Sequence, residues 1–220
     1  MKVMIFGASG MVGQGVLREC LLDGSIDKVL SVGRSASGST HAKLNDVVLA
    51  DITRLDRIAD ALRGYDTCFF CLGVSSAGMS EKRYTELTYD LTLNIARTLV
   101  ALNPAMRFVY ITGAGTDSSE QGRSMWARVK GRTENALLAL PFKSTHMLRP
   151  AIIQPLHGIR SKTTLYRLGY ILLAPFMTLF KRFFPGHFTT SEQMGRAMIS
   201  LARNGSPKRI LETIDINAIQ

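Results

Sequence analysis

Residues 2–22 read KVMIFGASGMVGQGVLRECLL, and they are the strongest indication of the fold class of this chain. The short apolar run Lys2–Phe6 is typical of a buried strand, and it leads directly into the loop GASGMVG at residues 7–13. The loop has the pattern G-x-x-G-x-x-G and opens the segment Met11–Leu22, whose apolar residues recur at helical spacing. A glycine loop between a strand and a helix is typical of dinucleotide-binding proteins, because the helix N-terminus offers free N–H groups and the positive end of its dipole to a pyrophosphate.

The rest of the chain alternates between short apolar runs and longer segments with helical periodicity. This alternation predicts an α/β fold, a doubly wound parallel sheet of the Rossmann type with a small C-terminal substrate-side region. We expect one domain over residues 1–220, with a substrate-side or lid segment within it at residues 150–190. The expected strands are Lys2–Phe6, Lys28–Val32, Val47–Ala50, Thr67–Leu72, Arg107–Thr112, Thr145–Leu148 and Ile210–Ile216; the expected helices are Met11–Leu22, Leu55–Arg63, Glu81–Leu102, Ser124–Leu138 and a last helix that starts at Thr190 and stops at Asn204-Gly205.

The end of the second expected strand indicates which dinucleotide the loop binds. An NAD-binding Rossmann fold usually carries an acidic residue about 20 positions past the loop, where it holds the ribose hydroxyls. Here Arg34 stands 21 residues beyond Gly13, followed by Ser35, and no carboxylate is close. A guanidinium is always charged and rich in donors, so it suits a 2′-phosphate. NADP(H) is therefore favoured over NAD(H); the alternative is an arginine that only faces solvent.

These features, together with later motifs, resemble the short-chain dehydrogenase/reductase superfamily in its atypical or epimerase-like branch. The chain is most similar to the small NADPH-binding Tat-interacting oxidoreductase group, and the resemblance covers nearly the whole chain. It implies an NADP(H)-dependent oxidoreductase or epimerase-like enzyme that acts on a small carbonyl-type substrate. The order of the motifs carries more weight than any one of them: the glycine loop, Gly33-Arg34, Asp51-Ile52, Val129-Lys130-Gly131 with Glu134, and Leu148-Arg149-Pro150.

The expected cofactor contacts combine the glycine loop with the carboxyl ends of several strands. A carboxylate at Asp51 could meet the adenine amino group, and small residues after the fourth strand would let the backbone pass close to a ribose. The full set of expected contacts is Gly7, Ser9, Gly10, Met11, Val12, Gly13, Arg34, Ser35, Asp51, Ile52, Leu72, Gly73, Thr112, Lys130 and Pro150.

The resemblance also implies a catalytic set, in which this chain departs from the family pattern. The superfamily uses a Tyr-x-x-x-Lys pair, in which the tyrosine exchanges a proton and the lysine binds the nicotinamide ribose and favours the tyrosinate. Lys130 is in a fitting place, but Trp126 stands where the tyrosine should be. Indole donates a hydrogen bond but does not titrate usefully. The family's serine or threonine would fall at Thr112 or Gly113, and Thr112 could still orient a carbonyl group.

Three interpretations of this departure stay open. In the first, the protein is a reductase whose proton comes from water, Tyr84, Tyr89 or His157. In the second, NADP(H) is a structural or sensing ligand, and the protein acts through a protein partner. In the third, the helix is misregistered, although Trp126 and Lys130 lie one helical turn apart, as the tyrosine and lysine should.

Composition limits the other functional classes. The 220 residues carry a formal net charge of +10, but the basic residues are dispersed and no nucleic-acid-binding motif is visible, so no specific nucleic-acid partner is expected. The apolar run Leu168–Phe180 has 13 residues, too few to span a bilayer, and leaves peripheral membrane contact as a minor alternative. We expect a cytoplasmic protein without a targeting peptide, and a homodimer or a protein partner remains open.

Metal binding is not expected. The four histidines, His41, His146, His157 and His187, lack metal-ligand spacing. Cys68 and Cys71 match C-x-x-C, but strand side chains three positions apart point to opposite faces of a sheet. Core packing is therefore the favoured interpretation of this pair.

Overall fold

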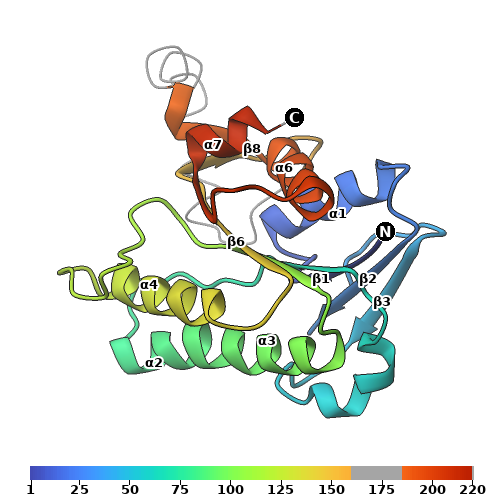
Figure 1. Cartoon of the computed structure of the whole chain (residues 1–220), viewed down its shortest axis with the longest axis horizontal. Coiled ribbons are helices and arrows are strands. Elements are labelled where there is room, and N and C mark those ends of the chain that lie inside the picture. Colours follow the sequence, from blue (N-terminus) through green and yellow to red (C-terminus); the bar gives the residue numbers. More distant parts are fainter. Residues whose placement is uncertain (160–184, 220) are drawn as a thin grey trace.

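A seven-stranded parallel sheet is the centre of the computed structural model, which describes residues 1–159 and 185–219 (Figure 1). The strand order is β3-β2-β1-β4-β5-β6-β9, so the chain winds outward from β1 in both directions. Every neighbouring pair in this sheet is parallel, which confirms the expected doubly wound Rossmann fold. The strands are β1 (Lys2–Phe6), β2 (Lys28–Gly33), β3 (Leu44–Val48), β4 (Thr67–Phe70), β5 (Arg107–Ile111), β6 (Ser144–Arg149) and β9 (Ile210–Glu212).

Helices cover both faces of the sheet, and each face has its own apolar core. On one face, α1 (Met11–Leu22), α6 (Ser191–Asn204) and α7 (Thr213–Ala218) pack against side chains such as Ile5 and Phe69. On the other, a 3₁₀ segment (Leu55–Leu62), α3 (Leu91–Leu102) and α4 (Met125–Leu138) pack against side chains such as Phe6 and Phe70. The fully buried strands therefore read as continuous apolar runs, as strands covered on both faces must.

The helices α1 and α6 pack unusually closely because a glycine of each lies at their contact. A Cβ atom on Gly15 would lie 2.6 Å from the carbonyl oxygen of Ser191, and one on Gly195 would lie 2.6 Å from Cγ of Glu19. Neither position has room for a side chain. The close contact joins the first helix after the glycine loop to a helix near the C-terminus, far away in the sequence.

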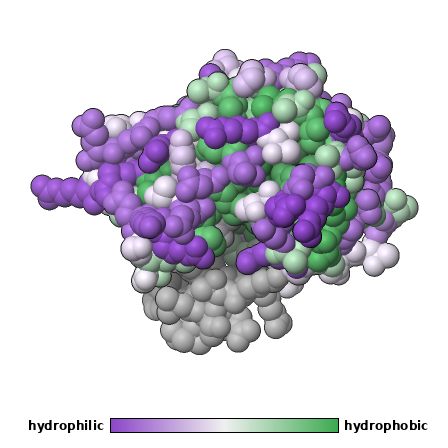
Figure 2. All heavy atoms as spheres, turned by 90° about the horizontal axis from the view of Figure 1, so that it is seen from below, coloured by the Kyte–Doolittle hydropathy of each residue, from purple (hydrophilic) through white to green (hydrophobic). Residues whose placement is uncertain are grey.

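The outer surface of the opposite helical layer is mixed. The short helix α2 (Glu81–Thr85) continues through a π-helical turn, Glu86–Asp90, into α3, and α4 lies beside them. Figure 2 shows this side from below: hydrophilic residues dominate, and hydrophobic ones show between them in patches. Along α3, Leu93 and Leu99 are buried, whereas Asn94 and Arg97 are exposed, as expected of amphipathic helices that cover a sheet.

Several element boundaries differ from the expectations. The expected strand Ile210–Ile216 is wrong after Glu212, because Glu212 and Asp215 form a capping box that starts α7. The expected strand Val47–Ala50 is instead Leu44–Val48, and the expected helix Leu55–Arg63 is a 3₁₀ segment with a kink at Ile58. A second small sheet of β7 (Ile152–Gln154) and β8 (Phe188–Thr190), with the 3₁₀ turn Pro185–His187 between them in sequence, was not predicted.

The last long helix begins and ends where the sequence predicts. The Thr190 side chain caps α6 by accepting a hydrogen bond of 3.0 Å from the backbone N–H of Gln193. Gly205 ends the helix with a φ of 72°, in the region that favours glycine. The run Leu168–Phe180 lies outside the described residues, and none of the helices described elsewhere in the chain is long and apolar enough to cross a membrane.

Cys68 and Cys71 face opposite sides of the sheet, as expected from their spacing. Cys68 belongs to the core beneath α3 and α4, and Cys71 packs against the core beneath α1 and α6. Both are free thiols. Within residues 1–159 and 185–219, no group of three or more His, Cys, Asp or Glu side chains could hold a metal ion.

Candidate functional site

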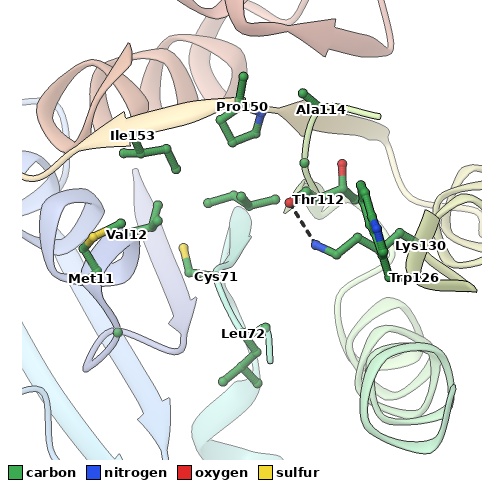
Figure 3. Close-up of a pocket in the computed structure, with 15 residues that line it drawn as sticks. Met11, Val12, Cys71, Leu72, Thr112, Ala114, Trp126, Lys130, Pro150 and Ile153 are labelled. Atoms are coloured by element: carbon green, nitrogen blue, oxygen red, sulfur yellow. Dashed lines mark hydrogen bonds between the residues drawn. The ribbon is translucent and has the colours of Figure 1, made fainter. Parts of the chain in front are cut away.

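A cavity of about 410 Å³ lies beyond the carboxyl ends of β1, β4, β5 and β6. Parallel sheets bind their ligands at this edge, where the order of the strands reverses. Figure 3 shows Met11 and Val12 on one side of the cavity and Trp126 and Lys130 on the other. The lining consists of Gly10, Met11, Val12, Cys71, Leu72, Gly73, Ile111, Thr112, Gly113, Ala114, Trp126, Lys130, Pro150, Ala151 and Ile153.

The glycine loop forms one wall, and its geometry requires glycine. Gly7 has a φ of +87°, and a Cβ atom on Gly13 would lie only 2.1 Å from the Gly7 carbonyl oxygen. Gly10 is the N-cap of α1, and no side chain caps the helix there. The first turn of α1 therefore presents uncapped N–H groups beside the cavity, and these residues fit the pyrophosphate of a dinucleotide.

The residues expected to hold the adenosine half lie outside the cavity lining. Arg34 is exposed and makes no hydrogen bond or ion pair within the described part of the chain. Ser35 Oγ lies 3.4 Å from Ser9 Oγ, so the end of β2 is beside the glycine loop. Asp51 is exposed and accepts hydrogen bonds from the backbone N–H and the hydroxyl of Thr53, whereas the Ile52 side chain is buried in the core.

Helix α4 brings the catalytic candidates to the opposite wall. Trp126 and Lys130 are one helical turn apart, and both are half-buried. The Lys130 ammonium donates a hydrogen bond of 2.9 Å to the carbonyl oxygen of Thr112, at the end of β5 (Figure 3). Burial lowers the pKa of Lys130 to about 8, and the negative charge of Glu134 opposes that change.

The indole of Trp126 lies against Gly115. A Cβ atom on this glycine, whose φ is +85°, would lie 3.4 Å from the Cη2 atom of the ring. This distance is an ordinary van der Waals contact, and the positive φ is the feature that favours glycine at this position. The loop after β5 therefore passes beside the ring of Trp126 at the wall of the cavity.

The hydroxyl of Thr112 does not point freely into the cavity. It donates a hydrogen bond of 2.6 Å to the carboxylate of Glu134, and Arg149 binds the same carboxylate through Nε at 3.1 and 3.2 Å. Arg149 also donates to Ser118 Oγ at 2.6 Å. This network ties the ends of β5 and β6 to α4. Glu134 and Arg149 both stand in the motifs that carry the family resemblance, but neither was among the expected site residues.

The alternative proton sources named from the sequence do not line this cavity. Tyr84 is buried and lines a smaller void behind Lys130. The guanidinium of Arg132 stacks on the ring of Tyr89, with Cζ of Arg132 lying 4.4 Å from the centre of that ring. His157 lies 2.6 Å from a carboxylate oxygen of Glu192.

Comparison with known proteins agrees with this geometry. The model of a family described as NAD(P)H-binding matches residues 7–141, which include the glycine loop and α4. The chain belongs to the NAD(P)H-binding family. The matched range contains the glycine loop, where we expect a nicotinamide dinucleotide to bind.

Two curated relatives confirm the resemblance inferred from the motifs. The chain is 28% identical over 154 residues to Protein HTATIP2 of Rattus norvegicus, covering 69% of this chain and 62% of that protein. It is also 28% identical over 159 residues to Protein fmp52, mitochondrial, of Emericella nidulans, covering 69% of this chain and 66% of that protein. Each match therefore spans less than two thirds of the relative's length.

A solved structure shows the same fold over nearly the whole chain. The Bordetella bronchiseptica enzyme WbmF, in complex with NAD+, has a TM-score of 0.69 at 16% sequence identity, covering 99% of this chain and 76% of WbmF. Together with the family match, this shows that the protein has the Rossmann fold of an NAD(P)H-binding family. Besides the expected Gly10, Met11, Val12, Leu72, Gly73, Thr112, Trp126, Lys130 and Pro150, the lining contains Cys71 and Gly113, which stand at the strand ends considered above. It also contains Ile111, Ala114, Ala151 and Ile153, which no sequence pattern indicated.

Proposed function

We propose that this protein binds NADP(H) in the cavity and reduces a small carbonyl-type substrate. The observation that carries the proposal is that one cavity joins the uncapped start of α1 to Lys130 of α4. When bound, the cofactor would supply a hydride. The chain would hold the pyrophosphate with the loop around Gly10 and would place the reacting carbonyl near Lys130 and Trp126.

The preference for NADP(H) rests on Arg34. Its guanidinium is exposed at the carboxyl end of β2, next to the strand that leads into the glycine loop. Ser9 and Ser35, whose hydroxyl oxygens lie 3.4 Å apart, add polar groups at the same corner. This corner suits a 2′-phosphate, because a free guanidinium forms strong hydrogen bonds with phosphate oxygens. The remaining expected contacts, Asp51 and Ile52, would lie near the adenine, Asp51 through its carboxylate and Ile52 through its backbone.

The character of the lining supports a small, mostly apolar substrate. Ile111, Ala114, Pro150 and Ile153 contribute apolar surface, and Lys130 supplies the charge. Such a pocket would favour an aldehyde, ketone or quinone over a highly charged metabolite.

A second candidate function is an NADP(H) sensor that acts through a protein partner or as a homodimer. Trp126 favours it, because an indole cannot exchange the proton that the family's tyrosine exchanges. In that case the cofactor would stabilise one form of the protein without being consumed. A cytoplasmic location stays part of the proposal, and fractionation of cells that express the tagged protein would test it against the mitochondrial location named for the fungal relative. We propose neither a specific nucleic-acid partner nor stable membrane attachment.

Calorimetry with NADPH and NADH, followed by NADPH oxidation with aldehydes, ketones and quinones, separates the two functions. Binding with turnover would support the reductase. Tight binding with no turnover for any acceptor would contradict it and favour the sensor. Failure to bind either cofactor would contradict both functions.

A further inference from the structure

If the protein reduces carbonyl groups, a proton must reach the carbonyl oxygen. Among the described residues that line the cavity, only Cys71 and Lys130 have side chains that titrate. Burial raises the pKa of the Cys71 thiol to about 12, so this thiol is a poor acid near neutral pH. The Thr112 hydroxyl already donates its proton to Glu134. Lys130 is therefore the acid that this wall offers.

The position of Lys130 suits this role. An ammonium group carries three protons, and the hydrogen bond to the Thr112 carbonyl oxygen uses one of them. This bond holds Nζ at the end of β5, on the same wall as Trp126. Figure 3 shows the lysine side chain extending along the wall toward Thr112. The remaining protons can be directed into the cavity.

The groups around Lys130 include one negative charge. Glu134 lies one turn further along α4, fully buried. Tyr84 and Tyr110 face Lys130 across the smaller void, and Cys71 faces it across the main cavity. Burial raises the pKa of the Tyr110 phenol well above its usual value, so this group stays neutral near pH 7. The Glu134 carboxylate, which also binds the guanidinium of Arg149, is thus the group that opposes loss of the lysine proton.

We propose that Nζ of Lys130 delivers the proton that a tyrosine supplies in the rest of the superfamily, and that Glu134 keeps Nζ protonated. This inference rests on the proposed reductase function. As the carbonyl carbon accepts the hydride, the π electron pair of the C=O bond moves onto oxygen. An O–H bond then forms while an N–H bond of Lys130 breaks, and its electron pair stays on nitrogen. The neutral amine takes a new proton from water.

Direct titration of Lys130 gives a test that does not require turnover. In protein labelled with ¹³C-lysine and free of cofactor, the Lys130 Cε resonance should titrate near pH 8, because burial lowers the pKa of this lysine. Glu134→Gln should move the midpoint to lower pH, since it removes the charge that raises this pKa. Glu134→Asp keeps the negative charge and is the substitute if Glu134→Gln does not fold. In Glu134→Asp the titration midpoint of Lys130 should stay closer to that of the parent protein. A midpoint unmoved by Glu134→Gln would overturn the role proposed for Glu134.

Activity then tests the proton transfer itself. The value of kcat/KM for NADPH oxidation should fall as pH rises through the titration midpoint of Lys130. Glu134→Gln should shift this fall in kcat/KM and the titration midpoint to lower pH together. Lys130→Arg keeps the charge but removes a usable acid, so kcat should fall by roughly 100-fold or more. Lys143→Arg, at an exposed position, is the matched control and should leave kcat unchanged. Methylamine in solution should partly restore the activity of Lys130→Ala, which a merely structural role would not produce.

The outcomes separate this inference from the proposed function. NADPH that binds without being oxidised by any acceptor would contradict the reductase, and the proton-donor role with it. Turnover with a pH profile that is unchanged in Lys130→Arg would overturn the proton-donor role alone and leave the reductase standing.

Discussion

Glu134 and Arg149 form an ion pair closed to solvent: Glu134 exposes 0% and Arg149 9% of its surface, and Arg149 Nε lies 3.1 and 3.2 Å from the two carboxylate oxygens. The pair joins α4 to the end of β6, and through the Thr112 hydroxyl it also reaches the end of β5. Because these three elements supply most of one wall of the cavity, the ion pair fixes the position of Lys130 relative to the sheet.

Removing one partner of this pair should destabilise the fold strongly. Arg149→Met leaves the Glu134 carboxylate buried without its cation, and we expect a loss of about 3–5 kcal/mol in the free energy of unfolding. Replacing both residues, Glu134→Leu with Arg149→Met, should cost less than the single change. Urea unfolding of the three proteins measures this. The exposed pair Arg54–Asp56 provides the control: Arg54→Gln should cost less than about 1 kcal/mol. Equal losses for Arg149→Met and Arg54→Gln would contradict the structural role.

Arg34 should select the cofactor. Arg34→Asp places a carboxylate where we expect the 2′-phosphate. The repulsion should weaken the binding of NADPH at least roughly tenfold relative to the binding of NADH, which is about 1.4 kcal/mol of binding free energy. Calorimetry with both cofactors measures the ratio. Arg57→Asp, a change on the exposed surface of the 3₁₀ segment, controls for a general loss of positive charge. The assignment is wrong if Arg34→Asp weakens the two cofactors equally.

Trp126→Tyr should raise the reductase activity. The new phenol would stand one helical turn from Lys130, as in the superfamily pattern, and could supply the proton that indole cannot. We expect kcat with a generic aldehyde or quinone to increase while the Kd for NADPH changes little. Trp126→Phe introduces the ring of tyrosine without its hydroxyl, so it should show no such increase in kcat. If Tyr and Phe behave alike, the absent phenol does not limit catalysis.

The stability of the protein should depend on the charge of Lys130. The folded pKa of about 8 lies below the usual lysine value of 10.5, so between these values the unfolded chain binds more protons than the folded one. Stability therefore gains from this group as pH rises through that window, and the charged lysine costs stability below pH 8. Lys130→Met should raise the free energy of unfolding more at pH 7 than at pH 10, with a difference of roughly 1–2 kcal/mol.

Urea unfolding at the two pH values measures this difference. Lys143→Met removes an exposed lysine and should show little change between them. A gain from Lys130→Met that is the same at pH 7 and pH 10 would show that burial does not depress the pKa of Lys130.

The fold class and part of the cavity lining could be predicted from the sequence alone. The glycine loop and the alternation of apolar runs with helical segments act over short distances, so local patterns are enough to predict β1, α1 and the parallel sheet. The spacing of Trp126 and Lys130 likewise follows from helical geometry alone. The boundary between β9 and α7 at Glu212 was harder to predict, because a strand pattern and a capping box lie within a few residues of each other.

The surroundings of these residues depend on how distant segments pack together, so they are visible only in the folded protein. The carboxyl ends of β1, β4, β5 and β6 come from distant parts of the chain and meet because parallel strands point the same way. That meeting places Lys130 against the Thr112 carbonyl oxygen and buries Glu134 with Arg149. The pKa of a lysine depends on the burial and charge that such distant segments create, so no local pattern could have given it.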